Sequence, residues 1–182
     1  MEPREFDFDT QLKLGKIGEK MVMRHLQEKE ETIDVKDLSN NPDFQFLGID
    51  FLWVRENKST GIIMGTFVDI KTDFLTHSSG KLFIETNSTA EKEGCMITSK
   101  AEYFLIYDPI LGKLYYLPIY ALRQRYYGKG HSKAGWISKN HFTIKNPTYE
   151  SEGFTVTLDE LAENIPNILV EDVDPIPDSE YV

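Results

Sequence analysis

Apolar and small residues recur at steps of three and four between about residues 10 and 30, and this spacing predicts an amphipathic helix. The stripe consists of Leu12, Gly15, Glu19, Val22 and Leu26. Glu19 is the one charged member. Two interpretations stay open for it. Either Glu19 borders the core and reaches solvent, or Gly15 and Gly18 let the helix approach a sheet closely while Glu19 reaches over the sheet edge towards a site.

Runs of β-branched and aromatic residues predict a series of strands after this helix. They span residues 32–38, 49–54, 61–71, 81–86, 103–107 and 113–117. The second run is apolar on both faces apart from Asp50, as expected for a central strand that is covered on each side. The segment Asn-Lys-Ser-Thr-Gly at 57–61 predicts a turn that joins the second and third strands into a hairpin.

Further helices are predicted near residues 96–101, 119–127 and 157–164, the last from its capping-box pattern. Residues 131–149 have the composition of a basic, aromatic loop. The order of elements predicts one α/β domain over residues 1–170, with a mixed β-sheet flanked by helices. The acid-rich residues 171–182 predict a flexible, disordered C-terminal tail.

Two charged residues, Asp69 and Lys71, lie in the otherwise apolar third strand, and both project from the same face because they are two residues apart. If the hairpin folds symmetrically about residues 58–59, Asp50 lies opposite residue 67 and close to Asp69. Residues on adjacent strands lie about 5 Å apart, so the two carboxylates could share one cation. The alternative is a structural ion pair within the sheet.

Charge is unevenly distributed along the chain. The net charge of −10 and the pI of about 4.9 argue, by themselves, against a nucleic-acid partner. Residues 109–149, however, contain no acid and seven bases, namely Lys113, Arg123, Arg125, Lys129, Lys133, Lys139 and Lys145. This stretch is either an ordinary solvated face or a patch for a phosphate backbone. In the second case the expected DNA contacts are Lys129, Lys133, Trp136 and Lys139.

Cysteine and histidine chemistry is restricted in this chain. Cys95 is the only cysteine, which excludes a disulfide within the chain and a cysteine-based zinc site. The four histidines show no tight metal-ligand spacing, so we expect carboxylates to hold any metal, and these favour Mg²⁺ or Mn²⁺. Neither a membrane-spanning apolar run nor a signal peptide is evident, so a cytoplasmic protein without a membrane partner is expected.

Several short motifs occur in a defined order along the first two thirds of the chain. They are Gly-Lys-Ile-Gly-Glu at 15–19, Gly-Ile-Asp-Phe at 48–51, Val-Asp-Ile-Lys at 68–71, Phe-Ile-Glu-Thr at 83–86 and the segment 99–107. This set resembles the PD-(D/E)XK nuclease superfamily over about residues 10–118. Pro42-Asp43 spells the name motif literally but lies in a turn, so Asp50 is the preferred ligand and Asp43 the alternative.

The resemblance implies a restriction-endonuclease-like core and a metal-dependent DNA endonuclease. The implied catalytic residues are Glu19, Asp50, Asp69 and Lys71. The implied ligands of Mg²⁺ or Mn²⁺ are Asp50, Asp69 and the backbone carbonyl of Ile70, with Glu19 and Glu85 as further ligands. Such a cation neutralises transition-state charge and activates a water, which Lys71 orients. Similar small nucleases include Holliday-junction resolvases and phage-encoded enzymes, which implies a DNA substrate, branched DNA included, and a homodimer.

Two other functions stay open. A catalytically inactive nuclease-like module would bind nucleic acid or protein without cleavage, although an intact set of site residues argues against it. An acidic DNA mimic would block the DNA site of another protein, which requires acids spread over one folded face. Here five acids are concentrated at 171–182, a segment that could also dock a protein partner or compete for the basic patch.

Overall fold

The computed structural model describes residues 8–74, 76–89, 92–126, 141–145 and 150–177. The four expected DNA contacts, Lys129, Lys133, Trp136 and Lys139, lie outside these residues. Their role in a basic patch therefore stays a prediction.

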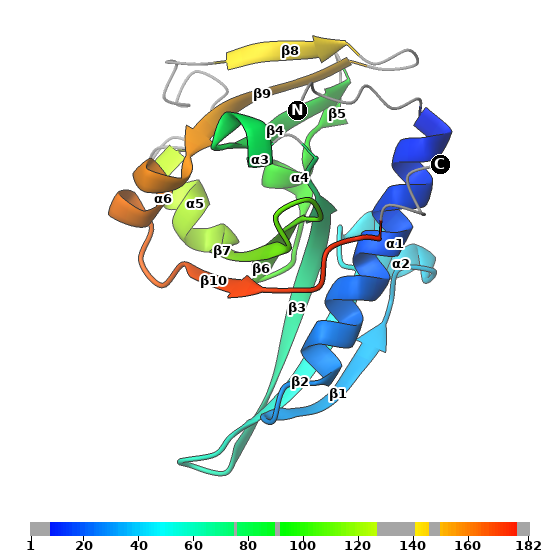
Figure 1. The fold of residues 1–182 in the computed structure, drawn as a ribbon, viewed down its shortest axis with the longest axis vertical. Helices are drawn as coiled ribbons and strands as arrows, with labels where there is room; N and C mark the ends of the chain where they lie inside the picture. Colours follow the sequence, from blue (N-terminus) through cyan, green and yellow to red (C-terminus); the bar gives the residue numbers. More distant parts are fainter. Residues whose placement is uncertain (1–7, 75, 90–91, 127–140, 146–149, 178–182) are drawn as a thin grey trace.

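A six-stranded sheet forms the centre of the fold (Figure 1). Its strands in spatial order are β1 (Thr32–Asp37), β2 (Phe51–Asn57), β3 (Ile62–Thr72), β6 (Tyr103–Asp108), β7 (Lys113–Pro118) and β10 (Leu169–Asp172). Strands β3 and β6 are parallel, and every other neighbouring pair is antiparallel. The expected mixed sheet is therefore confirmed, with mostly antiparallel pairing.

A second, antiparallel sheet was not predicted as such. Its strands in spatial order are β5 (Lys92–Glu93), β4 (Lys81–Thr89), β9 (Glu150–Thr157) and β8 (His141–Lys145). The interpretation of residues 131–149 as a loop is wrong at 141–145, which pair with β9. Basic and aromatic composition concealed a short strand that alternates in polarity and depends on a partner later in the chain.

Helices lie on both faces of the six-stranded sheet. They are α1 (Phe8–Gln27), α2 (Pro42–Phe46), α3 (Thr76–Ser79), α4 (Cys95–Thr98), α5 (Ile119–Tyr126) and α6 (Leu158–Asn164). The predicted helices near α1, α4, α5 and α6 are confirmed. The turn chemistry before Asp43 instead starts α2, because the Asn41 side chain accepts a hydrogen bond from the Asp43 amide and Pro42 suits a first helical position.

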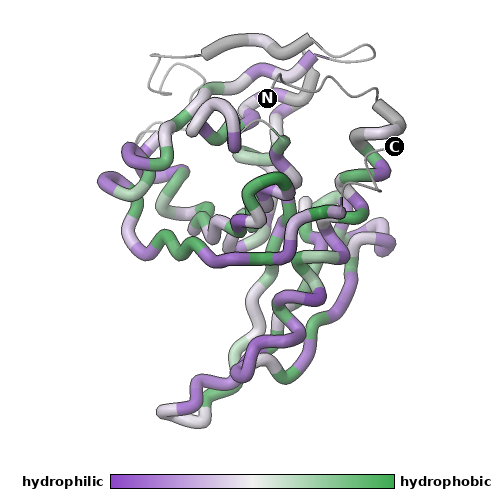
Figure 2. Tube along the Cα trace, in the orientation of Figure 1, coloured by the Kyte–Doolittle hydropathy of each residue, from purple (hydrophilic) through white to green (hydrophobic). Residues whose placement is uncertain are grey.

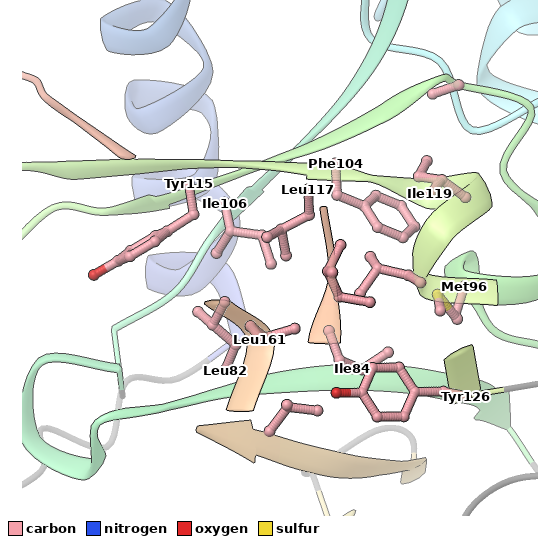
Figure 3. Packing of buried hydrophobic residues seen from close by; sticks show 14 of the residues in the cluster. Leu82, Ile84, Met96, Phe104, Ile106, Tyr115, Leu117, Ile119, Tyr126 and Leu161 are labelled. Atoms are coloured by element: carbon pink, nitrogen blue, oxygen red, sulfur yellow. The ribbon is translucent and has the colours of Figure 1, made fainter. Parts of the chain in front are cut away.

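Two apolar layers lie on opposite faces of the six-stranded sheet. One packs α1 against the sheet through Val22, Leu26, Phe51, Trp53, Val68, Ile70, Leu105 and Tyr116. The other fills the space between the two sheets and helices α4, α5 and α6, as Figure 3 shows for Leu82, Ile84, Met96, Phe104, Ile106, Leu117 and Leu161. Strands β6 and β7 are therefore covered on both faces. The prediction that residues 49–54 are covered on each side is wrong for β2, because Phe51 and Trp53 are buried against α1 whereas Leu52 and Val54 are only partly buried and belong to neither layer. Of the described helices, none has the length and apolar character needed to cross a membrane.

Helix α1 packs closely onto the end of β3. Hydrophobic and hydrophilic residues alternate along it in Figure 2. Its buried stripe is Leu14, Gly18, Val22 and Leu26, whereas Leu12, which was predicted to belong to the stripe, is exposed. A β-carbon at Gly18 would collide with Thr72 Oγ1, but one at Gly15 would meet nothing within 4 Å. The close approach expected from two glycines thus depends on Gly18 alone.

The expectation of a free acidic tail from residue 171 is wrong as far as residue 177. Strand β10 pairs with β7, and Val173 and Ile176 are buried in the α1-side core. Glu171 accepts hydrogen bonds from His25 Nε2 (2.8 Å), Lys29 Nζ (2.5 Å) and the Tyr116 hydroxyl (2.6 Å). Apolar residues between the acids, and these three donors, fix the segment that composition alone marked as disordered. Residues 178–182 lie outside the described part.

Replacing Glu171 with Gln should destabilise the fold at neutral pH by about 1–2 kcal/mol, because charge-assisted hydrogen bonds to three donors are weakened. Burial alone would raise the pKa of Glu171, but the bonds from His25, Lys29 and Tyr116 outweigh it and lower that pKa to about 2. The unfolded chain therefore binds the proton first, so this stabilisation is complete above the model-compound value of 4.5 and is lost as pH falls towards 2.

The measurement is the urea-unfolding midpoint at pH 3 and pH 7. The difference between wild type and E171Q should shrink at pH 3, whereas Glu163→Gln, at an exposed position of α6, should match wild type at both pH values. If E171Q is less stable than wild type by the same amount at pH 3 and pH 7, the charge of Glu171 is not what stabilises the fold.

Candidate active site

Asp69 and Lys71 lie on the face of β3 that is turned away from α1. Their neighbours Val68 and Ile70 belong to the α1-side core, so alternation directs the two charged residues to the other face. The Asp69 side chain is 1% exposed and that of Lys71 is 45% exposed. Lys71 Nζ lies 2.5 Å from Asp69 Oδ1. Within the described part of the chain, Asp69 Oδ2 has no hydrogen-bond donor.

Asp50 lies beside this pair at the start of β2. Phe51 pairs with Val68, which shifts the hairpin by two residues from the predicted register. The Asp50 amide donates to the Val68 carbonyl (2.9 Å), and Asp50 Oδ2 accepts from the Ile70 amide (2.7 Å). The predicted proximity of Asp50 to Asp69 is therefore confirmed, although residue 67 is not the residue opposite Asp50.

Glu19 completes a group of acids around the end of β3. It follows Gly18, which lies against Thr72. Burial raises the pKa of Glu19 to about 7, with further contributions from Asp50 and Asp37. Burial also raises the pKa of Asp50 to about 6, and Asp69 adds to this rise. The electrostatic effect of Asp50 on Glu19 agrees with the interpretation in which Glu19 reaches towards the site.

Lys71 remains a cation in this environment. Burial lowers the pKa of its ammonium group, but the carboxylates of Asp69 and Asp50 outweigh that effect, and the net shift is upward. One lysine therefore faces several carboxylates. The group carries more negative than positive charge when all the acids are ionised, a condition that favours binding of an added cation.

The donor set matches Mg²⁺ or Mn²⁺ in chemistry but is not arranged as a closed metal site. Asp50 and Asp69 supply hard oxygen atoms, and the buried, unpartnered Asp69 Oδ2 is an available ligand. Among the described residues, however, no three His, Cys, Asp or Glu side chains are grouped closely enough to hold a metal ion. Two protein carboxylates with solvent in the other positions is a common arrangement for Mg²⁺.

Glu85 and Asp43 differ from these residues in position. Glu85 lies on β4 of the second sheet and accepts a hydrogen bond from Ser151 (3.0 Å). It influences the pKa of Cys95, as Lys71 and Asp69 do, and so borders the site without lying beside Asp50. Asp43 is exposed on α2. Its hydrogen bond through the backbone to Asn41 belongs to the helix start.

Sequence reasoning missed two residues at the site. Asp37 ends β1 opposite Phe51 and raises the pKa values of both Glu19 and Asp50. The Cys95 thiol lies near Lys71, and burial raises its pKa to about 12, so it is neutral at physiological pH. In the sequence, Asp37 is one of several charges in the strand predicted at 32–38, and only the pairing of β1 with β2 places it near the other acids.

Hydrogen bonds that hold the segment before Asp50 were also not predicted from the sequence. They are formed by Ser99 and Arg123, which together are called the tether below. Gly48 has a positive φ of 60°, and a β-carbon there would lie 3.1 Å from Ser99 Cα. The fully buried Ser99 hydroxyl donates to the Gly48 carbonyl (2.8 Å) and accepts from the Ala101 amide (3.2 Å). Arg123 in turn donates to carbonyls of the α4 segment, including that of Ser99 (2.6 Å). These bonds fix the segment that leads into Asp50.

The chain matches no protein-family model, no curated protein and no solved structure. Support for a function therefore comes from the geometry of its own residues.

Ser99→Ala should destabilise the fold by about 1–3 kcal/mol, because the Gly48 carbonyl and the Ala101 amide each lose a buried partner. Chemical denaturation measures the change, and Lys100→Ala, at the exposed residue next to Ser99, is the control. A Ser99→Ala variant as stable as the control would show that the tether does not hold this segment.

Without divalent cations, the free energy of unfolding should fall as pH rises from 5 to 8. The folded protein binds protons at Glu19 and Asp50 with pKa values of about 7 and about 6, compared with 4.5 and 3.8 as ordinary values. The folded state therefore holds more protons in this range, and stability decreases as they are lost. Glu19→Gln and Asp50→Asn should each flatten the slope and raise Tm at pH 8.

The readout is Tm against pH in a chelating buffer. Asp43→Asn is the control for loss of one acid, and its curve should parallel that of wild type. If both Glu19→Gln and Asp50→Asn keep the wild-type dependence of Tm on pH, Glu19 and Asp50 are not the groups that bind these protons.

Proposed function

We propose that this protein is a metal-dependent DNA nuclease that hydrolyses phosphodiester bonds by means of a Mg²⁺- or Mn²⁺-activated water. The observation that carries the proposal is the pair Asp50 and Asp69. Both carboxylates lie at the end of β3 beside Lys71, and Asp69 is buried with one oxygen unpartnered. A fold that holds a buried and a partly buried carboxylate side by side bears a cost in free energy that a bound cation would offset.

Asp50, Asp69 and the Ile70 carbonyl would hold the cation, with Glu19 as a further ligand or water-holding group. When bound, Mg²⁺ supplies positive charge beside the scissile phosphate and lowers the pKa of water. The protein contributes the orientation of the carboxylates. The Ile70 amide holds Asp50 through Oδ2, and the rigid sheet holds Asp69.

Lys71 and Glu19 have separate roles in this proposal. Because its pKa is raised, Lys71 stays protonated and acts as a hydrogen-bond donor to phosphate oxygen or water. It cannot serve as a proton acceptor at neutral pH. Glu19 has a pKa of about 7, so it exchanges a proton readily near neutrality and suits the role of holding and deprotonating a water.

A second candidate is a nuclease-like module that binds nucleic acid without cleaving it. The observation in its favour is the absence of any metal-holding group of three ligands among the described residues. The short contact between Lys71 Nζ and Asp69 Oδ1 would also have to open for Asp69 to bind a cation through that oxygen.

Cleavage of linear and branched DNA and of RNA, with Mg²⁺, Mn²⁺ or a chelator, tests the proposal. Wild type should cleave at least one DNA substrate in a metal-dependent manner. Asp50→Asn, Asp69→Asn and Lys71→Ala should each lower the rate by about 10²–10³-fold, the usual effect of losing one electrostatic contact to the transition state. Asp43→Asn should cleave at the wild-type rate.

Equal residual cleavage by wild type and the three site variants would overturn the assignment of the site. DNA binding by wild type without cleavage in either metal would support the binding module instead. The Tm of each variant, measured in the assay buffer, shows whether a loss of activity comes from unfolding.

A further inference from the structure

The β2–β3 hairpin extends as an arm beyond the rest of the sheet (Figure 1). On one side, the register of β1 with β2 ends at Arg55, and a last backbone hydrogen bond joins the Glu56 amide to the Glu31 carbonyl. On the other side, β6 begins opposite Val68. In the part of the chain that the structure describes, no strand therefore pairs with the outer edge of β3 over residues 62–66.

This edge is apolar and exposed. The side chains of Ile62, Ile63 and Met64 are 57%, 64% and 41% exposed. Residues 59–68 contain no charged side chain and no proline. Sheet edges in soluble proteins are normally protected by charges, prolines or bulges, because their free N–H and C=O groups can pair with another strand. The edge of β3 has none of these protections.

The hydrogen bonds of Phe67 show in which direction the free backbone groups of the β3 edge point. The Phe67 amide donates to Glu102 Oε1 (3.2 Å), and the Phe67 carbonyl accepts from the Glu102 amide (2.8 Å). The Phe67 backbone therefore faces the outer edge. Since the hydrogen-bonding direction alternates along a strand, the N–H and C=O groups of Ile63 and Gly65 face outward as well.

We propose that the outer edge of β3 pairs antiparallel with the same edge of a second copy of this chain, about a two-fold axis at Met64. Ile63 of each copy then lies opposite Gly65 of the other, and the two outward-facing residues exchange both backbone hydrogen bonds. Met64 lies opposite Met64 in a non-hydrogen-bonded pair. The interface is isologous, so every contact is made twice, and the two central sheets join into one.

The edge accommodates a second copy because it is uncharged and has opposite charges, Lys58 and Glu102, at its two ends. Two molecules with a net charge of −10 repel each other over most of their surfaces, whereas this edge is uncharged. The register also brings the turn of each copy, which carries Lys58, towards the end of the other copy's edge, where the exposed Glu102 lies. DNA is a poorer fit, because residues 59–68 contain no lysine or arginine that could bind a phosphate.

Cysteine cross-linking tests the register. Met64→Cys should form a disulfide-linked dimer under mild oxidation, since non-hydrogen-bonded cross-strand pairs have Cα atoms about 4.5 Å apart, within the range for disulfides. The matched control is Ile33→Cys, which lies at an exposed apolar position on β1. Wild type controls for Cys95. Non-reducing gels should show cross-linking at least about tenfold faster for Met64→Cys than for either control.

Sedimentation of the reduced proteins tests the interface itself. Wild type should be dimeric in the micromolar range, and Ile63→Lys should weaken dimerisation at least about tenfold. Ile33→Lys should leave the dimer intact. A wild-type protein that is monomeric at about 100 μM, or equal cross-linking of Met64→Cys and Ile33→Cys, would overturn the proposal. Loss of DNA binding in an Ile63→Glu variant of a monomeric wild type would likewise overturn it, in favour of DNA at this edge. If Ile63→Lys fails to fold, the cross-linking comparison decides.

Discussion

The close packing of α1 onto the end of β3 is the contact on which the site depends. Gly18 lies against Thr72 with no room for a side chain, and the next residue, Glu19, is thereby brought to the group formed by Asp50, Asp69 and Lys71. The same helix buries Val22 and Leu26 against Phe51, Val68 and Ile70. The strand that carries Asp69 thus packs on α1 through Val68 and Ile70, while Asp69 and Lys71 lie on its other face.

The acids at this position oppose the stability of the fold in the absence of a cation. Burial and mutual repulsion raise the pKa values of Glu19 and Asp50, which means that ionising them costs more in the folded than in the unfolded chain. The Ile70 amide and the Lys71 ammonium offset part of that cost. Holding Asp37, Asp50 and Glu19 together lowers the stability of the fold when no cation is bound, and this cost is the physical basis of the proposal that a cation binds here.

The parts of this architecture that sequence predicts are local. Alternation gives β3, helical spacing gives α1, and a five-residue turn brings Asp50 near Asp69. The register of that hairpin was missed by two residues because Asn57 organises the turn, its side chain accepting from Ser59 and Thr60. Pairing between distant segments could not be predicted. Strand β10 depends on β7 and on Glu171 meeting His25, and the buried stripe of α1 depends on which face meets the sheet.

The second sheet and its helices do more than cover the central one. The segment that follows β5 contains α4 and Ser99, whose hydroxyl holds Gly48 two residues before Asp50, and α5 supplies Arg123, which binds the carbonyls of that segment. Asp50 is therefore positioned from both directions along the chain, by hairpin pairing on one side and by this tether on the other. Changes in the packing of α4 and α5 would therefore reach Asp50 through the backbone of Gly48, and the spacing between Asp50 and Asp69 decides whether the two carboxylates can share a cation.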